Sequence, residues 1–303
     1  MVDLALMIEG QDGVNWPRWQ RLAAAAEGLG YAGLYRSDHF TNPEGPHTDA
    51  LELWASLTWL ASNTARIEFG PMVSPVSFRN PVITAWTSAA VDDLSGGRLH
   101  LGMGAGWQER EHNSFGFDLL DIDQRFVRFE EGLNVVRQLL TSDEPTTFNG
   151  SFYHLDDAVL LPRPQRPGGP PIVIGGNGPK RTLPLAAKYA DEWNAVYLSA
   201  AEFAQRSALL DQLLDAQNRP RTAVRRTLMT RIIFGRDDAE AAQIAGDAEA
   251  ARAKGAIVGT ANQVVEELGK RAEAGAQRVM AQWLELDDID RIEAMAASVL
   301  PQL

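Results

Sequence analysis

Cysteine is absent from the 303-residue sequence, which excludes disulfide bonds, thiolate nucleophiles and cysteine-ligated zinc or iron–sulfur sites. Redox chemistry in this chain would therefore need a bound cofactor. Runs of basic residues are also absent, and 28 basic and 40 acidic side chains give a formal net charge of −12. Nucleic acids and anionic membrane surfaces are poor partners for such a chain, so small molecules are the expected ones.

Long hydrophobic runs are missing as well. No apolar stretch is long enough to cross a bilayer, and the N-terminal segment 1–8 lacks the basic region of a signal peptide. We therefore expect a soluble cytoplasmic protein. Because 45% of the residues are apolar and no shift in composition divides the chain, the sequence predicts one large domain over residues 1–303.

Short apolar runs alternate with stretches of helical periodicity along nearly the whole chain. The runs predict eight strands, at Leu4–Ile8, Gly33–Arg36, Ile67–Val73, Leu99–Met103, Ile172–Gly175, Glu192–Tyr197, Leu228–Phe234 and Arg278–Trp283. The periodic stretches predict helices at Trp16–Leu29, Ala50–Ala61, Pro81–Leu94, Asp123–Leu140, Pro179–Tyr189, Ala200–Gln217, Asp237–Ala253, Asn262–Ala274 and Asp287–Val299.

Eight strands that alternate with helices favour an α/β fold of the TIM (β/α)8 barrel type over a Rossmann sheet. A Rossmann sheet usually carries its glycine fingerprint after the first strand, and Glu9–Gly13 lacks that spacing. The alternation pauses at residues 141–171, where Asn149-Gly150 signals a hairpin and a proline-rich segment follows. We interpret this segment as an insertion before the fifth strand.

Four predicted strands end abruptly in glycine, proline or polar residues, which suggests one shared pocket at one end of the barrel. The first of these strand ends carries Asp38 and His39, and His39 is a candidate for proton exchange near neutral pH. The alternative interpretation is a structural histidine beside a loop-capping aspartate. The other histidines, at positions 47, 100, 112 and 154, show no metal-ligand spacing, so we expect no metal centre.

Two of the strand ends are rich in glycine. The segment 175–181, Gly-Gly-Asn-Gly-Pro-Lys-Arg, predicts an anion site because a glycine loop that opens a helix presents free backbone N–H groups. A plain βα turn is its alternative. The segment 102–106 is a weaker signal, and Trp107 after it either covers a ring-shaped ligand or shields the edge of the core.

Taken together, four segments of the sequence resemble the bacterial luciferase-like monooxygenase family, and within it the oxidoreductases that use the deazaflavin coenzyme F420. The resemblance is carried in order by Ser37-Asp-His-Phe40, by Gly70-Pro-Met-Val-Ser-Pro-Val-Ser-Phe-Arg-Asn-Pro81, by Leu94 to Trp107 and by Ile172-Val-Ile-Gly-Gly-Asn-Gly-Pro179. It implies a TIM barrel with an excursion that binds F420 or FMN.

The resemblance also implies a role for particular residues. His39 would be the catalytic acid or base with Asp38, and Met72-Val73 would be a bulge with a non-proline cis peptide behind the cofactor ring. The cofactor-binding residues implied in this way are Asp38, His39, Met72, Val73, Ser74, Gly104, Ala105, Gly106, Trp107, Gly175, Gly176, Asn177, Gly178 and Pro179. In the F420 enzymes that oxidise glucose 6-phosphate, a glutamate stands where this chain has Trp107, which argues against that substrate.

The expected function is hydride transfer between F420 and a small organic substrate, either an alcohol or carbonyl compound or one with a C=C or C=N bond. Lys180 and Arg181 are candidate partners for the carboxylates of the F420 tail. An FMN-dependent monooxygenase fed by a separate reductase and a non-catalytic flavin-binding protein are the alternatives. The apolar helices at 50–61 and 81–94 also suggest a homodimer.

Overall fold

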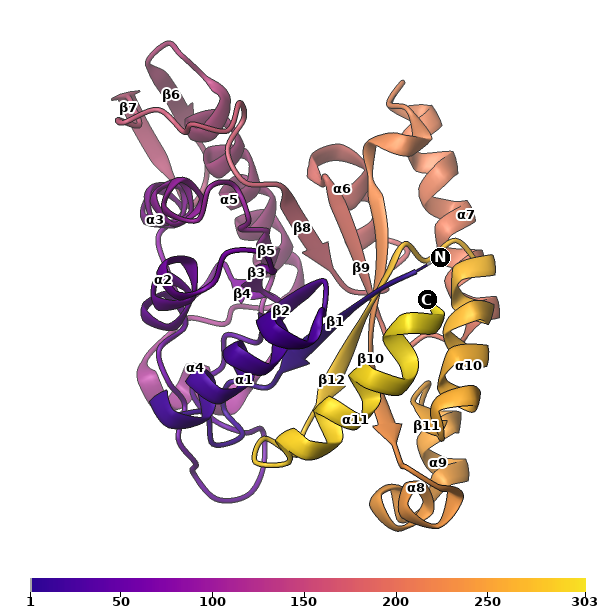
Figure 1. Ribbon diagram of the computed structural model, residues 1–303. Helices are drawn as coiled ribbons and strands as arrows, with labels where there is room; N and C mark the ends of the chain where they lie inside the picture. Colours follow the sequence, from indigo (N-terminus) through magenta and orange to yellow (C-terminus); the bar gives the residue numbers. More distant parts are fainter. Residues whose placement is uncertain (1) are drawn as a thin grey trace.

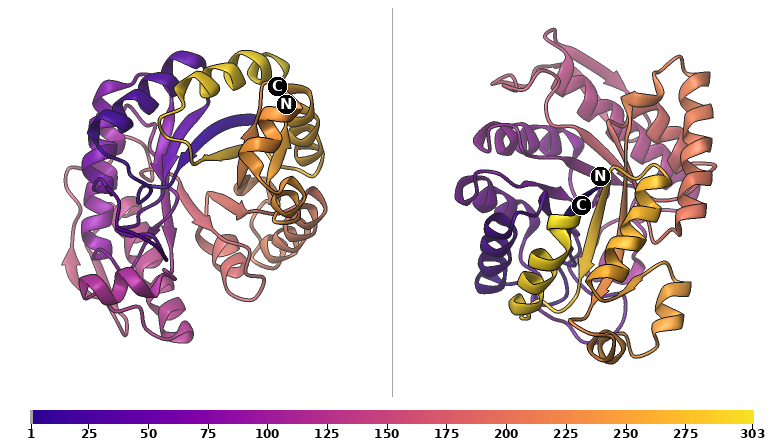
Figure 2. Two further views of the ribbon diagram at one scale, coloured as in Figure 1. Left: turned by 90° about the horizontal axis from the view of Figure 1, so that it is seen from below. Right: turned by 45° about the vertical axis from the view of Figure 1, so that its right-hand side comes forward.

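Short parallel strands, buried on both faces, form the centre of the computed structural model, which describes residues 2–303. Helices surround these strands, as the view from below shows (Figure 2). The fold is therefore the predicted α/β barrel of the TIM type. Within the described chain, no helix is both long and apolar enough to span a membrane.

Eight positions make up the barrel wall, in the order β1-β2-β3-β5-β8-β9-β10-β12 and back to β1. These strands are β1 (Asp3–Ile8), β2 (Gly33–Arg36), β3 (Glu68–Pro71), β5 (Leu101–Gly104), β8 (Ile172–Gly175), β9 (Glu192–Val196), β10 (Arg225–Phe234) and β12 (Arg278–Trp283). Two short strands extend the wall: β4 (Ser74–Pro75) pairs with β5, and β11 (Ile257–Gly259) pairs with β10.

The barrel closes between β3 and β5 through an isolated bridge of Phe69 with Leu99. The backbone N–H of His100 donates to the carbonyl of Phe69 at 2.8 Å. Two glycines permit this close approach, since a Cβ at Gly70 would lie 1.9 Å from the carbonyl oxygen of His100, and one at Gly102 would lie 2.0 Å from that of Pro71.

The helices are α1 (Trp16–Leu29), α2 (Leu53–Asn63), α3 (Pro81–Leu94), α4 (Glu109–Phe115), α5 (Ile122–Thr141), α6 (Thr182–Tyr189), α7 (Ala200–Ala216), α8 (Asp238–Ala245), α9 (Ala248–Ala253), α10 (Ala261–Glu273) and α11 (Ile289–Val299) (Figure 1). Local chemistry sets several of their ends. Asn15 caps α1, which ends at Gly30 in the left-handed conformation (φ 92°), and Asn80 caps α3 ahead of Pro81.

Some element predictions were wrong in detail. The predicted strand at 67–73 ends at Pro71 and resumes at Ser74, because the Met72–Val73 peptide is cis, as expected from the bulge. The predicted helix at 237–253 is two helices separated by Gly246 at φ 66°. Helix α4 and the three-residue strand β11 were not predicted, and neither forms a long periodic stretch.

The segment 141–171 contains an antiparallel hairpin of β6 (Thr146–Asn149) and β7 (His154–Ala158) between α5 and β8. Helix α5 runs back toward the N-terminal ends of the barrel strands, so this hairpin lies at that end. In Figure 1 it stands at the top left, far from α8 and α9 at the bottom. The segments that follow β5 and β10 lie at the other end, where the candidate site is found.

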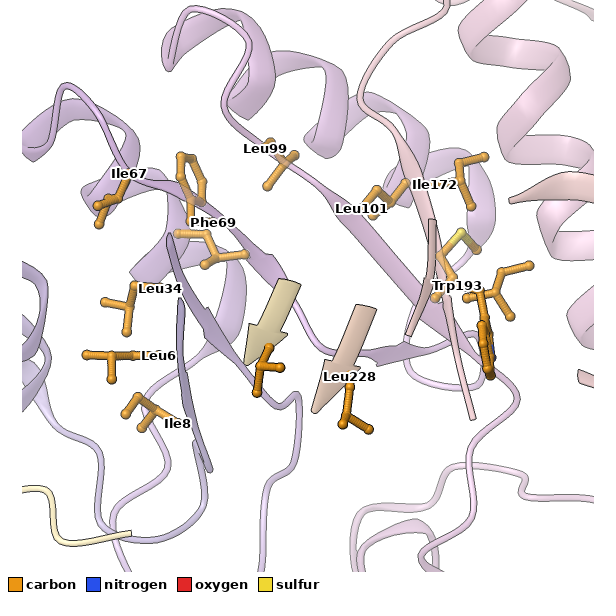
Figure 3. Close-up of a cluster of buried hydrophobic side chains, with 14 of the residues drawn as sticks. Leu6, Ile8, Leu34, Ile67, Phe69, Leu99, Leu101, Ile172, Trp193 and Leu228 are labelled. Atoms are coloured by element: carbon orange, nitrogen blue, oxygen red, sulfur yellow. The ribbon is translucent and has the colours of Figure 1, made fainter. Parts of the chain in front are cut away.

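The core has an outer and an inner layer. Leu4, Leu6 and Ile8 of β1 belong to the large cluster between the barrel and the helices, part of which Figure 3 shows. The alternating residues Ala5 and Met7 point into the barrel and join the inner cluster, which also contains Tyr35, Met72, Val173, Met229 and Met280. This inner layer forms the floor beneath the candidate site.

Candidate active site

A cavity of about 580 Å³ opens at the carboxyl ends of the barrel strands. All eight strand positions contribute to its lining, from the strand itself or from the residues just after it: Glu9, Ser37, Met72, Gly106, Gly175, Asn194, Met229 and Gln282, one from each. The cavity is large enough for a cofactor ring or a drug-sized ligand. The pocket predicted from four strand ends is therefore present, and it uses all eight.

His39 lines this cavity, and its Nδ1 atom lies 2.7 Å from Oε1 of Glu111. Glu111 is completely buried, and its second oxygen accepts the backbone N–H of Phe40 at 3.0 Å. An ionised carboxylate only accepts hydrogen bonds, so the proton of a neutral His39 sits on Nδ1. Nε2 is therefore the ring nitrogen available to a ligand, and the pair has the geometry of an acid–base dyad.

The surroundings of His39 raise its pKa above the ordinary value of 6.5. Burial alone lowers this pKa, but the hydrogen bond and the negative charge of Glu111 outweigh burial, with smaller contributions from Glu9 and Asp38. Trp107 packs edge-on against the His39 ring at 5.7 Å between centroids. Trp107 also lines the cavity and is 59% exposed, so it stands at the cavity edge.

Asp38 does not line the cavity, which corrects its expected place beside the cofactor ring. Its buried carboxylate accepts the hydroxyl of Ser74 at 2.6 Å and is ion-paired with Arg79. Ser74, in β4, also lies outside the cavity lining. The carboxylate hydrogen-bonded to His39 is Glu111, 72 residues along the chain, and Asp38 acts on His39 through its charge alone.

The cis peptide Met72–Val73 forms part of the cavity lining, as predicted. Two neighbouring glycines, Gly104 and Gly175, make room for the side chain of Val73. A Cβ at Gly104 would lie 2.6 Å from Val73 Cγ2, and one at Gly175 would lie 3.1 Å from Val73 Cγ1. Gly104 and Ala105 lie outside the lining, whereas Gly106, Gly175 and Gly176 belong to it.

We expect Gly104→Ala to destabilise the fold by about 1–3 kcal/mol, because the added methyl group displaces a β-branched side chain in a packed wall. Gly28→Ala is a matched control, since its Cβ meets nothing within 4 Å on an exposed face of α1. The control is expected to be neutral or to stabilise the protein by about 0.5–1 kcal/mol. Urea unfolding of both variants measures the difference, and equal midpoints would contradict the packing role of Gly104.

The loop at 175–179 holds its shape through Asn177. The Asn177 side chain donates to the carbonyl of Val196 at 2.7 Å and accepts the N–H of Val196 at 2.9 Å. Its amide group is therefore occupied with β9 and not aimed at an anion. Within residues 2–303, the backbone N–H groups of Asn177 and Gly178 make no backbone hydrogen bond, so they remain available just before α6.

The predicted neighbours of this loop have other positions. Pro179 and Lys180 are exposed and outside the cavity lining. Arg181 is ion-paired with Asp123 at the start of α5 and lies over the ring of Phe126. Binding of the F420 tail by Lys180 and Arg181 stays a prediction, in which Arg181 would exchange its exposed partner Asp123 for a tail carboxylate.

Sequence reasoning missed a group of polar residues that line the cavity from β1, β9 and β12. Tyr197 donates its hydroxyl to Gln282, Gln282 donates to Glu9 at 2.6 Å, and Gln11 donates to the other oxygen of Glu9 at 3.2 Å. Burial, together with the charge of Glu9, raises the pKa of Tyr197 to about 12. The signal that would have found these residues is their position at strand ends, the same rule that located His39.

The profile of the family described as luciferase-like monooxygenase matches residues 5–278. An F420-dependent glucose-6-phosphate dehydrogenase of Amycolatopsis mediterranei is 36% identical over 174 residues, which are 55% of this chain and 48% of the relative. An enzyme of the same name from Kineococcus radiotolerans is 30% identical over 225 residues, which are 72% of this chain and 64% of the relative.

The chain therefore spans about half to somewhat under two thirds of the length of these relatives. Among solved structures, an F420-dependent secondary alcohol dehydrogenase in complex with an F420-acetone adduct superposes with a TM-score of 0.84. That likeness covers 99% of this chain and 98% of the other at 19% identity, so it shows a shared fold.

Proposed function

The chain belongs to the luciferase-like monooxygenase family, and from this premise we propose that it is an oxidoreductase that uses coenzyme F420. Its substrate in this proposal is a small organic molecule that exchanges a hydride with the cofactor. Relatives named as F420-dependent dehydrogenases support the choice of cofactor. The observation that carries the proposal is the His39–Glu111 pair, which faces a cavity floored by Met72–Val73.

The residues present fit such a cofactor. The free N–H groups of Asn177 and Gly178 suit its phosphate, and the floor of Met72 and Val73 with Gly106 beside it suits a flat ring. When bound, F420 supplies a carbon atom that accepts or donates a hydride. Asn177 and Gly178 follow the lining residues Gly175 and Gly176 without belonging to the lining themselves. Ala105, Ser74 and Asp38 also lie outside the lining, and they take part only as support in this proposal.

The protein's own contribution to the reaction is positioning and proton transfer. In alcohol oxidation, Nε2 of His39 removes the hydroxyl proton while the carbinol C–H bond gives up its hydride, and a carbonyl compound results. In the reverse direction, the same nitrogen returns the proton to the oxygen. Glu111 stabilises the positive charge that His39 carries after it accepts the proton.

Oxygen dependence separates this function from the FMN-dependent alternative. We expect the purified protein with reduced F420 to pass its hydride to a carbonyl substrate equally well with and without oxygen. A reaction that needs reduced FMN and consumes oxygen would assign the chain to the monooxygenases of the family instead. The absence of turnover with either cofactor would favour a flavin-binding protein.

The rate of alcohol oxidation is expected to rise with pH and to level off above an apparent pKa higher than 6.5. The reason is that His39 must be neutral to accept a proton, and its pKa lies above 6.5. Glu111→Gln removes the charge that raises this pKa, so the profile should move to lower pH. Glu109→Gln, an exposed change on the same helix, is the matched control and should leave the profile in place.

A pH profile of single-turnover rates measures both variants. If the profile of Glu111→Gln coincides with that of the unaltered protein, the group that titrates is not His39.

We also propose that the protein is a homodimer. Helix α3 exposes Ile83, Trp86 and Leu94. Leu161 is also exposed and lies next to Trp86, since the indole N–H of Trp86 donates a hydrogen bond to the carbonyl of Leu161 at 3.3 Å. Exposed apolar groups of this size are typical of a contact between subunits. Sedimentation velocity at micromolar concentration tests this, and a monomer would contradict it.

A further inference from the structure

The two sides of the cavity differ in electrostatic character. Gly175 and Gly176, with the free N–H groups that follow them, lie at the end of β8, and Glu9 and Asp12 follow β1. In the closed order of the barrel, β8 is the fourth strand from β1 in either direction. The anion-binding loop and the two carboxylates are therefore on opposite sides of the cavity.

On the carboxylate side, the arginine whose charge reaches the lining, Arg231, is paired with Glu285 and not with Glu9 or Asp12. Neither Glu9 nor Asp12 forms an ion pair with a lysine or arginine of residues 2–303, and both line the cavity. Within residues 2–303, the side-chain carboxylate of Glu9 receives hydrogen bonds from the neutral amides of Gln11 and Gln282 and from no cation. Burial and the charge of Glu9 raise the pKa of Asp12, and a hydrogen bond with Asn42 and the charge of His39 offset only part of that rise.

The whole lining of the cavity, within the described part of the chain, contains no lysine and no arginine. His39 is the one side chain there that gains a positive charge in the reaction, and Glu111 already balances that charge. Asp12 also lines an adjoining surface hollow with Glu285, Asp287 and Asp288. The arginine in that hollow, Arg18, is bound to Asp287.

We infer that the substrate side of the cavity, defined by Glu9, Asp12, His39 and Gln282, accepts uncharged or cationic alcohols and their carbonyl products and rejects phosphate esters and carboxylates. This inference rests on the proposed function, because it assumes that the β8 side holds the cofactor phosphate. A phosphate ester placed beside Glu9 and Asp12 would meet two like charges and no arginine or lysine. The relatives named for glucose 6-phosphate thus differ from this chain in the substrate proposed for it.

Matched probes test this inference on the F420-loaded protein. The probes are 1-amino-2-propanol, 1,2-propanediol, lactate and glucose 6-phosphate, of which the first three share one carbinol group and differ in charge. Their binding is followed through the fluorescence of the bound deazaflavin, so that turnover is not required. We expect the cationic and the neutral alcohol to bind at least about tenfold more tightly than lactate, with no saturable binding of glucose 6-phosphate.

A double variant, Glu9→Gln with Asp12→Asn, should reduce this preference for the cation over lactate to within about threefold, because charge and not shape sets it. Its control, Glu144→Gln with Asp156→Asn, changes the net charge equally at the exposed, opposite end of the barrel and should keep the preference. Tight binding of lactate or glucose 6-phosphate would overturn the inference. It would also be overturned if neither 1-amino-2-propanol nor 1,2-propanediol binds at millimolar concentration. Failure of the proposed function is seen separately, as failure of the protein to bind F420.

Discussion

Replacement of His39 by alanine is expected to slow the chemical step by roughly 100-fold or more while cofactor affinity stays nearly unchanged. The physical reason is that Nε2 of His39 is the nitrogen of the dyad left free toward the cavity, and its loss leaves the substrate hydroxyl without a base. Single-turnover reduction of bound F420 by an identified alcohol measures the step directly.

His154→Ala is the matched control, because His154 is exposed on β7 at the far end of the barrel. The control should react at the rate of the unaltered protein. If His39→Ala keeps the rate of the unaltered protein, His39 is not the base. If the variant loses as much cofactor affinity as it loses rate, His39 is a binding residue.

Replacement of Glu192 by alanine is expected to destabilise the fold by about 3–5 kcal/mol, since it breaks a buried charged network. Glu192 is 1% exposed at the base of the barrel, where it lies 3.2 Å from Nδ1 of His100 and accepts the hydroxyl of Thr227 at 2.8 Å. The Thr227 hydroxyl in turn accepts a hydrogen bond from the side-chain amide of Asn194, a residue that lines the cavity. The change removes one of the two carboxylate partners of His100, which keeps Glu68 at 3.1 Å from its Nε2, and it loosens the support of Asn194.

Guanidinium unfolding measures this effect, and Asp215→Ala is the control. Asp215 pairs with Arg221 on the surface, where solvent screens the interaction, so its loss should leave the midpoint nearly unchanged. Glu192→Gln should fall between the two, because it keeps the shape and one hydrogen bond without the charge. A loss below 1 kcal/mol for Glu192→Ala would mean that the network does not stabilise the barrel.

The fold was largely predictable because most helices and strands are marked by patterns within their own segments of the sequence. The predicted bounds of α1, α3, β2 and β8 agree with the structure, since each has an apolar pattern and most have a cap or a glycine at an end. The break at Gly246 was missed because the helical pattern continues across it. Helix α4 was missed because it has seven residues, and its start is marked only by the cap Gln108 and by acidic residues in its first turn.

The site was predictable only where one segment of chain supplies it. His39 and Met72–Val73 belong to strand ends with a clear local signature, and both line the cavity. Glu111 comes from the unpredicted helix α4, so no local pattern connects it with His39. The position of Asp38 outside the cavity lining was not predicted, because adjacency to His39 along the chain does not reveal that the Asp38 carboxylate is bound to Arg79 and Ser74.

The central claim, dependence on F420, is tested most directly by titration of the cofactor-free protein with F420 and with FMN side by side. Both carry a phosphate for the loop at 175–178, so the comparison reports on the ring site and on the rest of the cofactor. Fluorescence of each ring at one fixed salt concentration gives the two dissociation constants, since both interactions are partly ionic. We expect F420 to bind more tightly than FMN, and tighter binding of FMN would contradict the dependence on F420.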